Sequence, residues 1–199
     1  MVVSGPSAVG KDTVLDALLA THNSPQRLQK CVTVTTRAPR PRDHGMEIDG
    51  VDYHFVTLTR FHEMVKDDDF LEYADVHGSY YGTPKRWVEE RRAEGVDIIL
   101  KIDVQGGIAV KKQVPDSVMI FLRPPSFEEL ERRLRARRTE TEEKIAVRLL
   151  NARSELSQMH HYDYAVINDT VPDAVSSINA ILLAEHFRIR HSPEHSDVR

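Results

Sequence analysis

The sequence predicts an α/β fold in which a parallel sheet is flanked by helices and interrupted by a small mixed α/β insert. Three observations predict it. Apolar segments of buried-strand length alternate with segments of helical period along most of the chain. A first strand leads through a glycine-bracketed turn directly into a helix. Between about residues 35 and 85, turn signals and short aromatic strands replace this alternation, which is typical of an inserted subdomain.

The strands of the sheet are expected where short apolar runs are bounded by turn signals. These runs lie at 2–4, 97–103, 118–122 and 164–167, and helices are expected at 12–21, 106–112, 126–137 and 171–186. The insert is expected to hold short strands within 51–56 and 79–83 and a helix near 59–66. The tail, 188–199, ends in the polar segment 191–199, which is expected to be frayed.

Composition limits the classes of function. A chain of 199 residues with a formal net charge of −4 fits one domain and lacks the broadly basic character of a nucleic-acid binder. The single cysteine, Cys31, excludes an internal disulfide framework and suits a reducing cytosol. No apolar run approaches the roughly 20 residues of a membrane span, and Lys11 interrupts the N-terminus too early for a signal peptide. We therefore expect a cytoplasmic protein with no membrane and no nucleic-acid partner.

The turn after the first strand has the G-x-x-x-x-G-K pattern of a phosphate-binding loop. Backbone N–H groups of such a loop surround an anion, and the following helix adds its dipole. Its lysine can place a charge between the β and γ phosphates of a nucleotide. A glycine-rich turn without a ligand is the alternative. The loop consists of Gly5, Pro6, Ser7, Ala8, Val9, Gly10 and Lys11.

Two acidic residues are candidate ligands of a magnesium ion. Asp12, followed by Thr13, stands where a serine or threonine is expected after the lysine. Asp103, at the end of a predicted strand, is a second candidate, which would hold the ion directly or through water. The alternative for Asp103 is a cap of the following helix.

Two motifs of the insert suit parts of a nucleotide. Arg37 and Arg40 are three residues apart in a proline-rich turn and could grip one phosphate, although a solvated basic loop has the same composition. The second motif, "FLEYADVHGSYYGT", sets Glu72 among aromatic residues. A carboxylate in a flat apolar slot suits guanine, whose N1–H and N2 amine both donate to it. The alternative is a half-buried aromatic hairpin with an exposed glutamate.

A basic segment, 132–149, follows the third predicted strand of the sheet. Arg133 and Arg137 are four residues apart and share a helical face, and Arg148 lies beyond an acidic turn. Arginines on a hinged lid would neutralise transition-state charge and exclude water. The alternative is a surface helix whose arginines pair with Glu128, Glu129 and Glu131.

Taken together, these motifs resemble the guanylate kinase family over residues 2–187. The resemblance rests on "SGPSAVGKDTV", "TVTTRAPR", "GVDYHFV", "FLEYADVHGSYYGT", "ILKIDVQGG", "RLRARRTETEEKIAVRL" and "VINDT", which follow one another in the family's order. It implies a P-loop NTPase-type parallel sheet flanked by helices, a small mixed α/β GMP-binding insert and a helical lid. The implied boundaries are a core at 1–32, 86–132 and 154–187, an insert at 33–85 and a lid at 133–153, within one domain. The implied reaction transfers the γ-phosphoryl group of ATP to GMP.

The resemblance also implies roles for individual residues. Thr33, Arg37, Arg40, Tyr53 and Tyr81 would bind the GMP phosphate, and Glu72, Thr83 and Asp103 would face guanine. Lys11, Arg133, Arg137 and Arg148 would surround the transferred phosphoryl group, and Asn168 would lie at the ATP base. The loop residues, with Asp12 and Thr13, would bind ATP, and Mg²⁺ would reach Asp12 and Asp103.

The sequence departs from the family's pattern at several positions. Ala8 replaces a glycine inside the loop, Asp12 replaces serine or threonine, and Lys101 stands where an acidic residue is common. A long link after Arg40 lets Arg42 compete for the phosphate role, and Arg138 stands where glycine is common. Two other classes stay open: a scaffold domain of the same fold that binds phosphorylated peptides, and a nucleic-acid binder that uses 132–138.

Overall fold

The computed structural model describes residues 1–24, 26–42, 45–76, 78–136 and 141–189. Its centre is a five-stranded sheet in the order β11-β10-β1-β9-β2, and all of its neighbouring strands pair in parallel. The strands are β1 (Val2–Ser4), β2 (Leu28–Lys30), β9 (Asp97–Lys101), β10 (Met119–Arg123) and β11 (Tyr164–Ile167). Their near-continuous apolar sequences fit a sheet that is covered on both faces. The predicted parallel sheet is confirmed.

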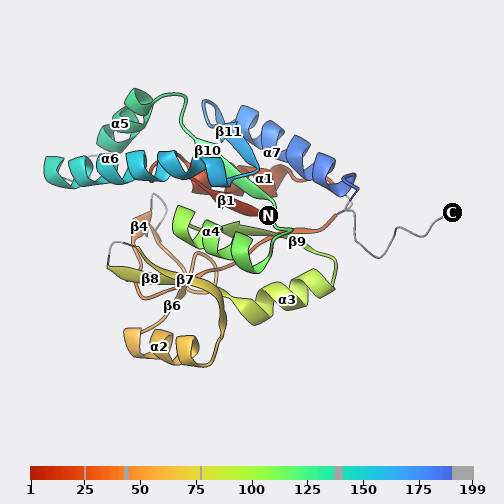
Figure 1. Cartoon of the computed structure of the whole chain (residues 1–199). Coiled ribbons are helices and arrows are strands. Elements are labelled where there is room, and N and C mark those ends of the chain that lie inside the picture. Colours follow the sequence, from red (N-terminus) through yellow and green to blue (C-terminus); the bar gives the residue numbers. More distant parts are fainter. Residues whose placement is uncertain (25, 43–44, 77, 137–140, 190–199) are drawn as a thin grey trace.

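Alternate residues of the central strand face two separate packing layers. Val3 packs with the buried residues of α1 (Lys11–Thr21) and α7 (Val171–His186), while Val2 packs on the side of α3 (Lys85–Ala93) and α4 (Val104–Gln113). Figure 1 shows α7 and α4 on opposite sides of the strands. Because side chains alternate across a strand, two adjacent valines anchor both layers of the core.

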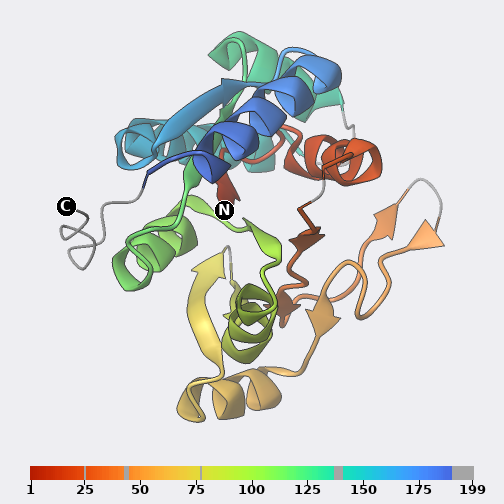
Figure 2. The ribbon, with the colours of Figure 1, turned by 90° about the vertical axis from the view of Figure 1, so that its right-hand side faces the viewer.

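The insert forms a second, smaller sheet in the order β6-β3-β8-β7, where β3 and β6 are parallel and the other pairs antiparallel. Its members are β3 (Val34–Thr35), β6 (His54–Phe55), β7 (Phe70–Val76) and β8 (Ser79–Pro84), with a separate ribbon of β4 (Pro41–Arg42) and β5 (Gly45–Met46). Helix α2 (Leu58–Lys66) packs on it through Phe61, whose ring stacks on Phe70 at 4.6 Å between centroids. In Figures 1 and 2 the insert lies to one side of the core, below the main sheet in these views.

Two helices follow β10 and complete the core. Helix α5 (Phe127–Ala136) and helix α6 (Glu142–Ser157) contribute Leu130, Leu134 and Ala152 to the same apolar cluster as α1 and α7. A short 3₁₀ turn, Gln158–His161, then leads to β11. None of the described helices is both long enough and apolar enough to cross a membrane.

Candidate functional site

The phosphate loop follows the carboxyl end of β1 and opens onto the N-terminus of α1. Gly10, the N-cap of α1, has φ 91° and ψ 26°, a left-handed conformation that glycine adopts without strain. No described side chain caps this helix. The first backbone N–H groups and the dipole of α1 are therefore available to an anion in the loop.

Lys11 is turned into the loop that it follows. Its Nζ donates to the carbonyl oxygen of Gly5 at 2.6 Å and to that of Pro6 at 3.1 Å. Burial lowers the pKa of this lysine, although nearby Glu155 and Asp12 favour its charge. Ala8 has φ 64°, where a Cβ costs about 1–2 kcal/mol. The loop thus accepts a strained alanine at the position where the resemblance leads one to expect glycine.

Asn168 holds the phosphate loop through a side-chain hydrogen bond. This residue is 4% exposed, and its Nδ2 donates to the carbonyl oxygen of Val9 at 2.7 Å. Arg133 lies beside it, because its guanidinium donates to the carbonyl oxygens of Asn168 and Asp169 at 3.0 and 3.4 Å. The same guanidinium pairs with Glu129 at 2.7 Å. The structure thus brings Asn168 to the loop and Arg133 to Asn168, and it also shows the arginine–glutamate pairing expected of a surface helix.

A cluster of charged and aromatic side chains lies in the insert. Arg37 donates from Nη2 to Oε1 of Glu47 at 3.0 Å, and Nη1 lies 2.9 Å from Oε2. Arg37 Nε donates to Oη of Tyr81 at 3.1 Å, and its Cζ lies 5.2 Å from the centre of the Tyr53 ring. Burial opposes the charge of Arg37, but Glu47 and Tyr81 outweigh it and raise the pKa of the guanidinium. Glu47 also accepts from the backbone N–H of Arg40 at 2.8 Å.

Glu47 was not among the predicted site residues. Residues 37 and 47 have no periodic relation, because a turn and the β4–β5 ribbon separate them. The signal that could have found Glu47 is chemical: a carboxylate in a stretch with several arginines has a cation to pair with. Arg40 is exposed, and Thr33 is buried beside β3 with its carbonyl accepting from the backbone N–H of His54. Arg42 is the last residue of β4 and pairs with Gly45 of β5.

Glu72 is a buried carboxylate. The residue is 6% exposed, and its Oε1 accepts from Thr83 Oγ1 at 2.6 Å across the β7–β8 hairpin. Burial raises the pKa of Glu72 to about 7, helped by the charge of Asp103 and opposed by the hydrogen bond from Thr83. The alternative of an aromatic hairpin is confirmed for the two strands, but its expectation that Glu72 is exposed is wrong. A Cβ on Gly106 would come 2.6 Å from Oε2, so only glycine fits against this carboxylate.

Asp103 is the N-cap of α4, and its Oδ1 accepts from the backbone N–H of Gly106 at 2.9 Å. The helix-capping alternative is therefore realised. Asp103 also lines a cavity of about 250 Å³ between β7, α4 and α6, together with Asp75, Asn151, Ser154 and Glu155. Arg148 lies on α6 one turn before Asn151, on the same face of that helix. Arg137 lies outside the described residues.

Asp12 and Lys101, two departures from the family's pattern, form an ion pair. Lys101 Nζ lies 2.5 Å from Asp12 Oδ1 and donates to Tyr53 Oη at 3.2 Å. Burial opposes ionisation of Asp12, but the ammonium holds its pKa below the usual value. Burial likewise opposes the charge of Lys101, and Asp12 and Tyr53 raise its pKa. The contact joins the phosphate loop to the insert.

The residues present fit a magnesium ion that arrives with a nucleotide. Among the described residues, no group of three or more His, Cys, Asp and Glu side chains could hold a metal ion. Asp12 Oδ1 and Asp103 Oδ1 are each engaged, by Lys101 and by the backbone N–H of Gly106. Since Mg²⁺ commonly combines one or two protein carboxylates with water and substrate phosphates, the remaining carboxylate oxygens suffice for it.

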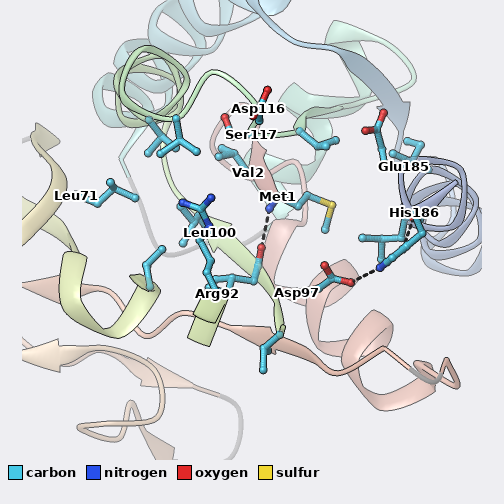
Figure 3. A pocket seen from close by; sticks show the side chains of 18 of the residues that line it. Met1, Val2, Leu71, Arg92, Asp97, Leu100, Asp116, Ser117, Glu185 and His186 are labelled. Carbon is cyan, nitrogen blue, oxygen red and sulfur yellow. Dashed lines mark hydrogen bonds and ion pairs between the residues drawn. The ribbon is translucent and has the colours of Figure 1, made fainter. Parts of the chain in front are cut away.

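A further cavity of about 340 Å³ lies elsewhere (Figure 3). It is lined by Met1, Leu100, Asp97 and His186 among others, and the His186–Asp97 contact of 2.9 Å closes one side of it. Met1 and Asp97 precede or begin their strands, so this cavity lies toward the amino ends of β1 and β9. Ligands of open parallel sheets bind at the opposite, carboxyl ends. The cavity is therefore separate from the phosphate loop.

Comparisons with known proteins show which family this chain resembles. The family model described as guanylate kinase matches residues 1–185. The chain is 47% identical over 189 residues to a guanylate kinase of Clostridium perfringens strain SM101, covering 95% of this chain and 84% of that protein. It is 46% identical over 189 residues to a guanylate kinase of Streptococcus thermophilus strain CNRZ 1066, covering 95% and 88%.

A solved structure gives the same result. The crystal structure of guanylate kinase from Anaplasma phagocytophilum has a TM-score of 0.74 at 32% sequence identity. The match covers 94% of this chain and 85% of that chain. Sequence and fold therefore agree over nearly the whole length. The chain belongs to the guanylate kinase family.

Proposed function

We propose that this chain transfers the γ-phosphoryl group of ATP to GMP, giving ADP and GDP. The observation that carries the proposal is the contact between the two phosphate-binding regions. Lys101 joins Asp12, the residue after Lys11, to Tyr53 of the insert. Phosphoryl transfer requires donor and acceptor phosphates in line and in close contact, and it needs positive charge around the group in transit.

The acceptor site recognises guanine through Glu72. Thr83 occupies one lone pair of the carboxylate and fixes its orientation. The remaining lone pairs accept from N1–H and the N2 amine of guanine, a donor pair that adenine lacks. Asp103 faces guanine from the first turn of α4, where its Oδ1 accepts from the backbone N–H of Gly106 and Glu72 Oε2 lies against the same glycine. The phosphate of GMP is bound by Thr33, Arg37, Arg40, Tyr53 and Tyr81.

The donor site is formed by the loop. Residues 5–13 surround the phosphates of ATP, and Lys11 stabilises the charge that develops on the γ-phosphoryl group. Asn168, whose side chain holds the loop at Val9, lies at the base of ATP. Asp12 and Asp103 would hold a Mg²⁺ ion that arrives with ATP, directly or through water, and the ion would supply charge neutralisation at the phosphates.

The arginines of the lid act on the same group. Residues 133–153 form a lid between the core segments 1–32, 86–132 and 154–187, and residues 33–85 form the GMP-binding insert. Arg133 already contacts the backbone of Asn168, the residue that holds the loop, and Arg137 and Arg148 join it when the lid closes over both substrates. Closure excludes water, which would otherwise accept the phosphoryl group.

The partners of the protein in this account are small molecules, GMP and ATP, in the cytoplasm. The proposal is tested by measuring ADP formation from ATP and Mg²⁺ with and without GMP. Release of ADP that depends on GMP supports the kinase. Binding of GMP without release of ADP contradicts it and favours the peptide-binding class of the same fold.

A further inference from the structure

Lys101 lies where the phosphate loop meets the insert. Its Nζ donates to Asp12 Oδ1 at 2.5 Å and to Tyr53 Oη at 3.2 Å, and it lies 5.0 Å from the centre of the Tyr53 ring. The Lys101 side chain is 13% exposed. The ammonium is therefore fixed in a partly desolvated position, where its interaction with an anion is stronger than in water.

A second cation approaches the same pair of tyrosines. Arg37 Nε donates to Tyr81 Oη at 3.1 Å, and Arg37 Cζ lies 5.2 Å from the centre of the Tyr53 ring. The rings of Tyr53 and Tyr81 are 5.9 Å apart between centroids. Two cations and two phenol hydroxyls thus converge on one region at the border of insert and core. This set of donors suits a doubly charged phosphate monoester.

The charge balance of this cluster indicates how it accepts an anion. Asp12 pairs with Lys101 and Glu47 with Arg37, so the two side-chain pairs carry no net charge. Lysine has three N–H donors, of which Asp12 and Tyr53 take two. Among the described residues Lys101 has no further acceptor, so one of its donors is left for an oxygen of the anion. Asp12 meanwhile keeps the ammonium in place, because its carboxylate is anchored at the start of α1.

We propose that Lys101 binds the phosphate group of GMP and that Asp12 positions the Lys101 ammonium for this contact. The inference rests on the proposed function and deepens it. It adds to the acceptor site a binding residue from β9, a strand of the core sheet. Because Asp12 follows Lys11 directly, the proposed contact also links the phosphate of GMP to the end of the phosphate loop.

The proposal predicts a loss of affinity that depends on the phosphate. Isothermal titration calorimetry without ATP and without Mg²⁺ measures GMP binding alone, with guanosine as the ligand that lacks the phosphate. Lys101→Met lowers the affinity for GMP by about tenfold to a hundredfold, the effect of losing one charge-assisted hydrogen bond. The affinity for guanosine stays unchanged. Lys101→Arg, which keeps the charge, retains GMP affinity within about threefold of the parent.

Lys30 supplies a matched control. Its ammonium pairs with Asp16 on α1 at 2.9 Å, and the exposed fractions of the two side chains, 20% and 54%, resemble the 13% and 57% of Lys101 and Asp12. Asp16 lies one turn beyond Asp12 on the same helix. Lys30→Met therefore removes a lysine–aspartate pair of equal kind without touching Tyr53, and GMP affinity is expected to remain unchanged.

The positioning role of Asp12 is tested by a double-mutant cycle. Asp12→Asn weakens GMP binding in the parent protein, because Lys101 loses its anchor. In the Lys101→Met background the same substitution has no further effect on GMP affinity. Additive losses would show that Asp12 acts on GMP without Lys101.

Two outcomes overturn the inference. Equal losses of GMP and guanosine affinity in Lys101→Met would mean that Lys101 supports the site and does not contact the phosphate. Unchanged GMP affinity in Lys101→Met would mean that the phosphate is bound without it. In both cases the parent protein still binds GMP and the proposed function stands. If the parent protein does not bind GMP, the proposed function fails together with the inference.

Discussion

Thr83 donates a 2.6 Å hydrogen bond to Glu72 across the β7–β8 hairpin, and the carboxylate that accepts it is buried against the first turn of α4. Burial raises the pKa of Glu72 to about 7, so the group titrates in the physiological range. Recognition of guanine by two acceptor oxygens requires the ionised form. The chemistry of the base site is therefore coupled to pH.

GMP binding is expected to weaken as Glu72 becomes protonated. With a pKa of about 7, only about a tenth of the carboxylate is ionised at pH 6, so the affinity is about tenfold lower at pH 6 than at pH 8. The phosphate of GMP also titrates in this range, and Glu72→Gln serves as the control because it keeps that effect. Calorimetry at both pH values should show a loss that is about tenfold larger in the parent than in Glu72→Gln. Equal losses would place guanine recognition elsewhere.

The same group makes stability depend on pH. Glu72 has a folded-state pKa of about 7, above the usual value of 4.5, so its protonated form favours the native state. That contribution is complete below about pH 4.5 and is lost as the pH rises through 7. Relative to Glu72→Gln, the parent is expected to lose about 2–4 kcal/mol of unfolding free energy between pH 4.5 and 8. Urea unfolding of both proteins across this range measures the difference, and a constant difference would contradict the raised pKa.

The pair of Arg37 and Glu47 is expected to support both stability and phosphate binding. Their side chains are 9% and 10% exposed, so Glu47→Gln leaves a nearly buried guanidinium without its charged partner, at a cost of about 2–3 kcal/mol. Because Glu47 also fixes the backbone of Arg40, we expect KM for GMP to rise at least about tenfold.

The control for this variant lies in the same insert. Arg60 and Glu63 form an ion pair whose side chains are both 53% exposed, and Glu63→Gln should change stability by less than about 0.5 kcal/mol. Thermal unfolding and steady-state kinetics compare the two. An unchanged KM for GMP in Glu47→Gln would show that the phosphate is held independently of this pair.

Lys11 is expected to act mainly on the chemical step. Lys11→Met removes the charge that follows the moving phosphoryl group, and kcat should fall at least about a hundredfold, near 3 kcal/mol. Lys112, exposed at the end of α4, is the matched control, since Lys112→Met removes an equal charge away from the loop. Single-turnover kinetics and thermal unfolding separate catalysis from folding. A near-normal kcat in Lys11→Met would refute the role of this loop.

The elements with a strong apolar signal could be predicted from the sequence, and those without one could not. The strands at 2–4 and 164–167 and the helix at 171–186 agree with the structure residue for residue. β2 was missed because "LQK" is a half-buried edge strand with one apolar residue. α3 was missed because "KRWVEERRA" buries only Val88. Tertiary contacts, and not local periodicity, hold both in place.

The candidate site shows the same limit at the level of single residues. Chemical type pointed to Lys11 and Glu72 and the family resemblance added Thr83, and the structure brings Glu72 and Thr83 into contact. Sequence alone could not reveal the pairing of Asp12 with Lys101, because 89 residues separate them and each reads as an isolated departure. The structure shows that the two departures compensate each other in charge. Such pairs depend on which strands are neighbours, which residue spacing does not specify.

The measurement that tests the account most directly is a comparison of GMP, AMP, CMP and UMP as phosphoryl acceptors with ATP and Mg²⁺. A site that holds guanine by two donors on one buried carboxylate rejects bases that lack this donor pair. The account predicts that GMP gives a kcat/KM at least about a hundredfold above each of the other three acceptors. Turnover of AMP comparable to that of GMP, or no release of ADP with any acceptor, would contradict it.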